Sequence, residues 1–180
     1  MTDPLNGPAA GEGEMPRVID IRHIEAKPVE VTASAQECLA LARRFALVRI
    51  KRLSATLRLS VEGQVVSASG RLRAAIVQSC AISGEDLPVT IDEAITLRFV
   101  PEGDDASPDE EIEITEAECD EIPYEGGRID LGEAIAQSLA LSIDPYATGP
   151  DADAARKAAG LSDEAASGPF AALAALRDKK

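Results

Sequence analysis

The chain contains very few aromatic residues: among its 180 residues there are three phenylalanines, two tyrosines and no tryptophan. Aromatic side chains contribute much of the buried area in most cores, so the core of this protein must be aliphatic and rich in alanine. Apolar residues still make up 45% of the sequence, which is normal for a globular chain. No apolar run approaches the roughly 20 residues that cross a bilayer. The sequence therefore predicts a globular protein that does not act in a membrane.

Signals for catalysis and for metal binding are missing as well. No motif places a nucleophile beside the single histidine, His23, and the sequence has no Walker loop, G-x-G-x-x-G, H-E-x-x-H or G-x-S-x-G pattern. Cys38, Cys80 and Cys119 form no C-x-x-C pair, and an odd number of widely spaced cysteines is typical of reduced thiols. We therefore predict a non-enzymatic protein without a cofactor or a metal site. Cys38 and Cys80 are expected to be buried, and Cys119 to be unreactive among carboxylates.

Charge is plentiful but unevenly distributed. The net charge is −14 at pH 7, yet the stretch from Arg43 to Arg73 holds eight basic residues and one acid. The stretch from Glu85 to Glu125 holds sixteen acids and one base. A basic segment followed by a strongly acidic one indicates two different interaction surfaces. The N-terminus shows no basic and apolar signal pattern, so we expect a cytoplasmic location.

The clearest structural signal is a hairpin with a defined register. Apolar residues occupy the odd positions from Leu53 to Val61 and polar residues occupy the even ones, as in a half-buried strand. Gly63–Gln64 then suits a two-residue type II′ turn. If Glu62 pairs with Val65, every core residue of the first strand faces a core-parity residue of the second. The turn and the alternation therefore predict the same pairing.

Further elements surround this hairpin. Apolar residues on one parity from Leu87 to Phe99 extend it to an antiparallel meander over 53–99, and Ser34 with Glu37 forms a capping box for a helix over 35–45. A second helix is expected over 131–143, a strand over 17–24 and a short edge strand at 112–114, while 116–127 is expected to be irregular. The predicted fold class is α+β, with a small antiparallel sheet packed against two or three helices. Residues 1–14 are predicted to be a disordered tail, 15–146 a single domain, 147–168 a flexible linker and 169–180 a C-terminal docking helix or tail.

Two candidate surfaces follow from these predictions. Arg58, Arg71 and Arg73 share the outward face of the hairpin and can hold phosphates; the full set of RNA-binding candidates is Arg49, Lys51, Arg52, Arg58, Arg71 and Arg73. The alternative is an ordinary solvated face, or one covered by the acidic 101–125 stretch. That stretch supplies the candidates for a protein partner, namely Asp104, Asp105, Asp109, Glu110, Glu111 and Glu113. The rival function is an acidic adaptor without nucleic-acid contact.

Several short motifs resemble one known family. They are Q-S-C at 78–80, R-I-D-L-G-E-A-I at 128–135, L-A-L-S-I-D-P-Y at 139–146 and G-P-F-A-A-L-A-A-L at 168–176. Together they resemble, over roughly 15–180, the YceD family, a domain-of-unknown-function family also called large ribosomal RNA subunit accumulation protein. Cys80 and the Pro-Tyr ending at 145–146 resemble the alphaproteobacterial branch of this bacterial family.

The resemblance implies a role in the accumulation of 23S ribosomal RNA, through processing or large-subunit assembly. The partners that it implies are large-subunit ribosomal RNA or a pre-50S particle, and basic ribosomal proteins are a further possibility. Many relatives carry C-x-x-C at the end of the second strand of the meander, but Val77 occupies the first of those positions here. A zinc role is therefore not expected for this chain. The oligomeric state stays open.

Overall fold

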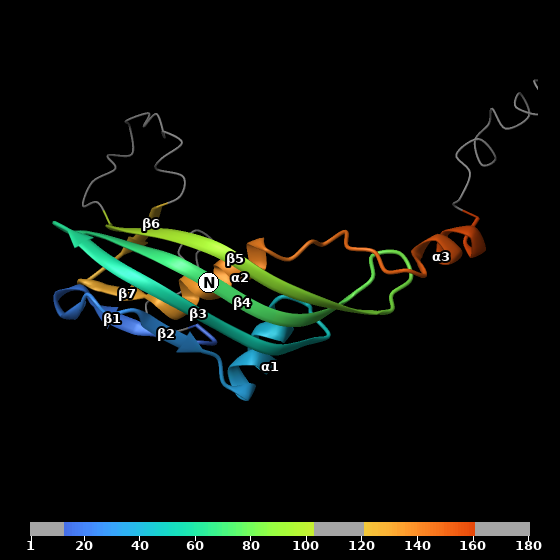
Figure 1. Cartoon of the computed structure of the whole chain (residues 1–180), viewed down its shortest axis with the longest axis horizontal. Helices are drawn as coiled ribbons and strands as arrows, with labels where there is room; N and C mark the ends of the chain where they lie inside the picture. Colours follow the sequence, from blue (N-terminus) through green and yellow to red (C-terminus); the bar gives the residue numbers. More distant parts are fainter. Residues whose placement is uncertain (1–12, 103–120, 161–180) are drawn as a thin grey trace, which may run out of the picture.

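The computed structural model describes residues 13–102 and 121–160 (Figure 1). In chain order the elements are β1 (Val18–Asp20), the 3₁₀ helix η1 (Ile21–His23), β2 (Val29–Thr32), α1 (Ala35–Arg44), β3 (Arg49–Glu62), β4 (Val65–Ser79), β5 (Asp86–Pro101), β6 (Glu121–Tyr124), β7 (Arg128–Asp130), α2 (Leu131–Leu141) and α3 (Ala152–Ala158). Five strands form one sheet in the order β2-β3-β4-β5-β6, while β1 and β7 form a separate pair. The α+β class is therefore confirmed.

The predicted hairpin register is confirmed. Glu62 pairs with Val65, Leu57 with Gly70 and Leu53 with Ala74. A type II′ turn has a positive φ at its first central residue and a negative φ at its second. Gly63 has a φ of 64°, and the φ of Gln64 is not positive, so the turn matches the predicted type. The strands run beyond the predicted limits, because β3 begins at Arg49 and β5 ends at Pro101.

A β-bulge interrupts the pairing of β3 near its start. Ile50 pairs with Ile76 whereas Arg52 pairs with Ala75, so Lys51 is the extra residue. Simple alternation from Leu53 would turn Arg49 toward the core. Because the bulge moves the pattern by one residue, Ile50 is buried and Arg49 is exposed instead.

The edges of the sheet differ from the prediction. β2 was not anticipated, and it pairs antiparallel with β3. β6 pairs parallel with β5, with Arg98 opposite Glu121, so the five-stranded sheet is mixed. The prediction of irregular chain over 116–127 was therefore wrong for residues 121–124.

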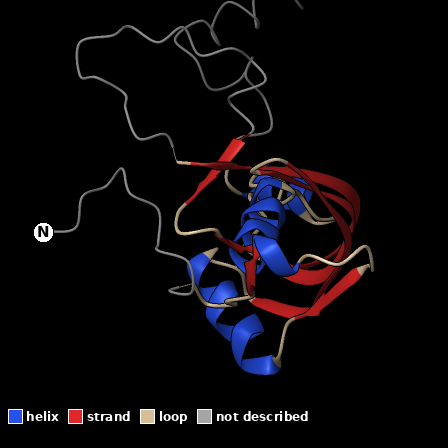
Figure 2. Cartoon of the chain, turned by 90° about the vertical axis from the view of Figure 1, so that its left-hand side faces the viewer, coloured by secondary structure: helices blue, strands red, loops and turns tan. Residues whose placement is uncertain are grey.

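Helices α1 and α2 lie on one side of the curved sheet and share one core with it (Figure 2). The Ser34–Glu37 capping box is present at the start of α1. At the start of α2, the Asp130 carboxylate accepts hydrogen bonds from the backbone N–H groups of Gly132 and Glu133. Leu41, Leu72 and Leu139 are among the completely buried aliphatic side chains that form this core. The other side of the sheet carries no described helix.

The N-terminal region differs in two details from the predicted strand over 17–24. β1 covers only Val18–Asp20 and pairs with β7, and His23 lies in η1 rather than in a strand. Two ion pairs attach this region to α1, namely Arg17 with Glu37 at 2.7 Å and Glu14 with Arg44. Arg44 also forms an ion pair with Glu133 of α2. The Met15 side chain is 1% exposed, so the chain contributes to the core close to the start of the described residues.

Other predictions concern residues outside the described ranges. These are most of the N-terminal tail, the edge strand at 112–114, Cys119, the docking helix at 169–180 and all six acidic partner candidates, Asp104, Asp105, Asp109, Glu110, Glu111 and Glu113. Within the segment expected to be a linker, the structure contains α3, whose Ala152 is buried.

Candidate nucleic-acid interface

The outer face is the side of the five-stranded sheet that points away from α1 and α2. Its residues on the three long strands are Arg52, Ser54, Thr56, Arg58 and Ser60 on β3, Ser67, Ser69, Arg71, Arg73 and Ala75 on β4, and Thr90, Asp92, Ala94, Thr96 and Arg98 on β5. Residues between these positions are mostly buried against the helices, which is the expected result of period-two alternation. The sequence pattern therefore separates a core face from a polar one.

Arginine is the only charged residue type at the outer positions 52–60 of β3 and 67–75 of β4. Arg58 pairs with Ser69, and Arg71 pairs with Thr56. These two pairs are separated along the strands by one further pair, Leu57 with Gly70. The diagonal arrangement expected from the sequence is therefore present. Within the described part of the chain, no carboxylate lies within ion-pair distance of Arg52 or Arg58. Both guanidinium groups are exposed and, as far as the described residues go, have no acidic partner.

One carboxylate is placed between two of these arginines. Asp92 on β5 pairs in register with Arg73 and forms ion pairs with both Arg71 and Arg73. The hydrogen bond from Arg71 holds the pKa of Asp92 below its usual range. All three side chains are roughly half exposed. Asp92 therefore occupies the position that a phosphate oxygen would take between two guanidinium groups.

The remaining basic candidates lie at the bulged end of β3. Arg49, Lys51 and Arg52 are all exposed. Arg52 belongs to the outer face. Ile50 is buried toward the helices, and neighbouring residues of a strand point to opposite faces, so Arg49 also points to the outer face. The bulge thus brings Arg49 to the side of the sheet that carries Arg73.

One outer-face arginine was missed by the sequence analysis. Arg98 on β5 lies opposite Ser67 and forms an ion pair with Glu121 of β6 at 2.7 Å. Arg98 is the single basic residue in the acidic stretch from Glu85 to Glu125, so a search for clusters of basic residues in the sequence does not find it. The pairing of β4 with β5 would have revealed it, but the six-residue loop between these strands does not define the register in the way that a two-residue turn does.

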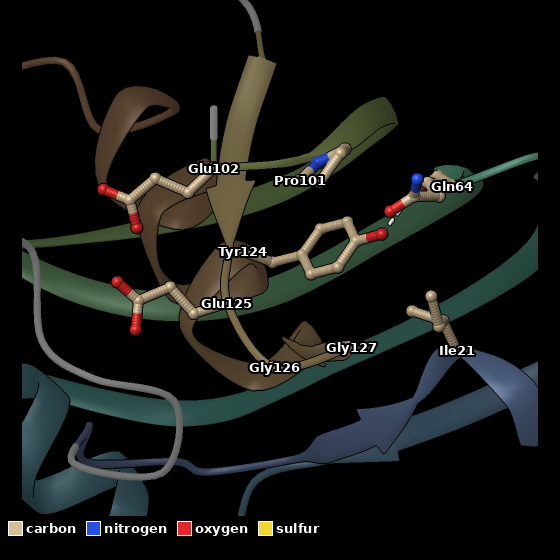
Figure 3. A pocket seen from close by; sticks show the side chains of 8 residues that line it. All are labelled: Ile21, Gln64, Pro101, Glu102, Tyr124, Glu125, Gly126 and Gly127. Carbon is tan, nitrogen blue, oxygen red and sulfur yellow. Dashed lines mark hydrogen bonds between the residues drawn. The ribbon is translucent and has the colours of Figure 1, made fainter. Parts of the chain in front are cut away.

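A cavity of about 530 Å³ lies beside β6, at the end of the sheet that carries the Gly63–Gln64 turn (Figure 3). The Tyr124 hydroxyl donates a 2.5 Å hydrogen bond across it to the backbone carbonyl of Gln64, and Glu102 and Glu125 lie together at one side. Their mutual hydrogen bond and like charge raise the pKa of Glu102. Among the described residues, the lining of this cavity contains no histidine, cysteine or serine.

The histidine and the described cysteines do not form a catalytic group. His23 is exposed, with Asp20 at 3.8 Å, whereas Cys80 is buried directly after β4. The Cys80 sulfur accepts hydrogen bonds from the backbone N–H groups of Ser83 and Gly149. A hydrogen bond from the Ser83 side chain, together with these backbone N–H groups, lowers the pKa of Cys80 to about 6. Burial raises the pKa of Cys38. Both thiols are free and buried, as expected.

Backbone contacts surround Cys80, which directly follows β4. Ala81 donates a hydrogen bond to the carbonyl of Ala147, and the Gln78 side chain donates one to the carbonyl of Asp144. Within residues 13–102 and 121–160, no group of three or more potential ligands could hold a metal ion. Hydrogen bonds therefore connect the end of β4 and the residues after it to the loop that follows α2. Val77 is buried near these contacts.

The fold and the outer face define an α+β protein whose exposed sheet surface carries clustered arginines. The chain belongs to the family described as large ribosomal RNA subunit accumulation protein YceD, whose model matches residues 68–177. The match covers more than half of the chain and includes most of β4, β5 and both helices that follow, but not Arg49, Lys51, Arg52 or Arg58. No curated protein and no solved structure matches the chain. In the described residues, no helix is long and apolar enough to span a membrane.

Proposed function

We propose that this protein is a non-enzymatic factor that supports the accumulation of large-subunit ribosomal RNA, and that it binds RNA phosphates through the outer face. The family description refers to this accumulation. The observation that carries the proposal is the open outer face with Arg52, Arg58, Arg71 and Arg73 at neighbouring register positions. The proposed partner is large-subunit ribosomal RNA or the pre-50S particle in which it matures.

The charge pattern supports phosphate as the ligand. Guanidinium groups bind phosphate oxygens in a bidentate manner, and each neutralised phosphate releases counterions. Burying an arginine against a protein partner without a carboxylate would cost desolvation energy instead. The guanidinium groups of Arg52 and Arg58, which have no carboxylate partner among residues 13–102 and 121–160, therefore favour a polyanion.

The composition of the outer face also opposes an ordinary protein partner. Protein interfaces are enriched in aromatic residues and methionine at their centre. None of the large apolar side chains that the structure exposes, including Leu39, Leu141 and Tyr146, belongs to the outer face. The polar character of the face is consistent with binding to a charged, hydrated backbone.

The test is binding of the purified full chain to large-subunit ribosomal RNA over a salt titration. The variant carries Arg58→Glu, Arg71→Glu and Arg73→Glu. The matched control carries Lys27→Glu, Arg128→Glu and Lys157→Glu, which change the net charge equally at exposed positions away from the outer face. We expect the variant to lose at least about 100-fold in affinity and the control to keep most of it.

Equal losses in both variants would show that only net charge matters, and would refute the outer face as the site. Absence of binding by the unaltered protein at low salt would refute direct RNA contact. The acidic candidates at 104–113 would then become the surface to test against basic ribosomal proteins.

A further inference from the structure

The arginines of the outer face are interleaved with hydroxyl groups. Seven serine and threonine side chains lie between them: Ser54, Thr56, Ser60, Ser67, Ser69, Thr90 and Thr96. Among the described residues, none of these hydroxyl groups makes a side-chain hydrogen bond. Each hydroxyl group can donate and accept hydrogen bonds, so a row of them between cations can contact a ligand that presents hydroxyl groups as well as phosphates.

No described aromatic side chain belongs to the outer face. Phe99 and Tyr124 are buried, Phe45 ends α1, and Tyr146 is exposed in the loop after α2. Proteins that bind single-stranded nucleic acid usually stack bases on aromatic rings. The outer face lacks this means of holding unpaired bases, although it can contact a backbone.

The dimensions of the face suit a double helix. Arg98 pairs with Ser67 near one end of β4, and Arg49 pairs with Val77 near the other end. The distance along β4 from Ser67 to Val77 is about 34 Å, at about 3.4 Å per residue. This span exceeds the width of about 12 Å even of the B-DNA major groove, so arginines at both ends can reach the two phosphate strands that border one groove. The sheet curves around α1 and α2, so the outer face is its convex side (Figure 2).

We infer that the RNA bound by the outer face is double-stranded, and that the face contacts its wide, shallow minor groove. The arginines contact phosphates, and the hydroxyl row contacts ribose 2′-hydroxyl groups, which A-form RNA displays in that groove. The contact reads helix shape and sugar identity rather than base sequence. This inference rests on the proposed function and adds the class of RNA that the face selects.

The experiment compares three ligands of the same sequence: an RNA duplex, a DNA duplex and single-stranded RNA. The hydroxyl variant carries Ser67→Ala, Ser69→Ala and Thr96→Val, with every arginine retained; valine preserves the strand propensity of threonine. We expect the unaltered protein to prefer duplex RNA by about tenfold or more. The hydroxyl variant should lose roughly tenfold toward duplex RNA while its DNA affinity stays unchanged.

A second measurement needs no protein variant. Replacing riboses by deoxyriboses in one strand of the RNA duplex should weaken binding of the unaltered protein, because 2′-hydroxyl groups are removed while the phosphates remain. Thermal unfolding of the hydroxyl variant shows whether its fold is intact.

The outcomes separate the inference from the proposed function. Single-stranded RNA that binds as tightly as duplex RNA, with affinity still lost in the Arg58→Glu, Arg71→Glu, Arg73→Glu variant, overturns the duplex inference and leaves the proposed function standing. Equal binding of RNA and DNA duplexes also overturns it. If no ligand binds in a manner that depends on these arginines, the proposed function fails, and the inference fails with it.

Discussion

Replacing Asp92 by asparagine should strengthen RNA binding. In the free protein its carboxylate forms ion pairs with Arg71 and Arg73. Its pKa lies below the usual range because Arg71 hydrogen bonds to it, so it is ionised at neutral pH and repels an incoming phosphate. Asp92→Asn keeps the size of the side chain and removes this charge. Both guanidinium groups are then available to the RNA.

The magnitude follows from counterion release. Each additional phosphate that a protein neutralises makes the slope of log K against log salt more negative by about 0.7–0.9. If one arginine that Asp92 now neutralises contacts a phosphate instead, the slope should change by about this amount. Affinity near physiological salt should then rise about threefold to tenfold. The stability of the protein should change little, because exposed ion pairs contribute little.

The assay is fluorescence anisotropy with labelled duplex RNA at a series of salt concentrations. Asp153→Asn is the matched control, because it also removes one acid and frees one arginine, Arg156, but on α3 rather than on the outer face. We expect its affinity and slope to remain near those of the unaltered protein. If Asp92→Asn binds RNA no better than Asp153→Asn, Arg71 and Arg73 do not contact phosphates and the reasoning is refuted.

Three further predictions concern the fold. Gly70→Ala should destabilise the protein by about 3 kcal/mol in urea unfolding, because a Cβ there would overlap the backbone carbonyl of Thr56; a loss below about 0.5 kcal/mol would contradict this geometry. The hydrogen bond from Arg17 lowers the pKa of Glu37 from 4.5 to about 2. Ionised Glu37 should therefore stabilise the fold by about 1–2 kcal/mol above pH 4.5. That contribution should be lost as the pH falls toward 2, and a Glu37→Gln protein with an unchanged acid-unfolding profile would refute it. Thiolate absorbance should show a step near pH 6 that disappears in Cys80→Ser, whereas persistence of the step in this variant would show that another group titrates.

Much of the central sheet could be predicted from local signals. The alternation from Leu53 and the Gly63–Gln64 turn agree with each other, so the register of β3 and β4 followed from sequence alone. The Ser34–Glu37 capping box was equally local, because both of its hydrogen bonds lie within four residues. These features depend on neighbours in the chain, and the sequence contains those neighbours.

The parts that were missed depend on distant partners. β2, β6 and β7 are three or four residues long, too short for a clear period, and they are defined by the strands beside which they lie. The bulge at Lys51 interrupts an alternation without a glycine to mark it, so the orientation of Arg49 could not be read from the pattern. Arg98 joins the outer face only through the register of a six-residue loop. Of the candidate site, the sequence therefore predicted the arginines on the two strands that the two-residue turn joins, and not the one on β5.

The outer face is tested as the RNA site by an NMR titration of the isotopically labelled full chain with duplex RNA, following the arginine Nε–Hε signals. We predict that the signals of Arg58, Arg71 and Arg73 shift in a salt-sensitive manner, together with backbone amides of β3, β4 and β5. Signals of arginines away from the outer face, such as Arg22 and Arg128, should remain in place. Shifts confined to those arginines or to α1, with Arg58, Arg71 and Arg73 unchanged, would contradict the outer face as the RNA site.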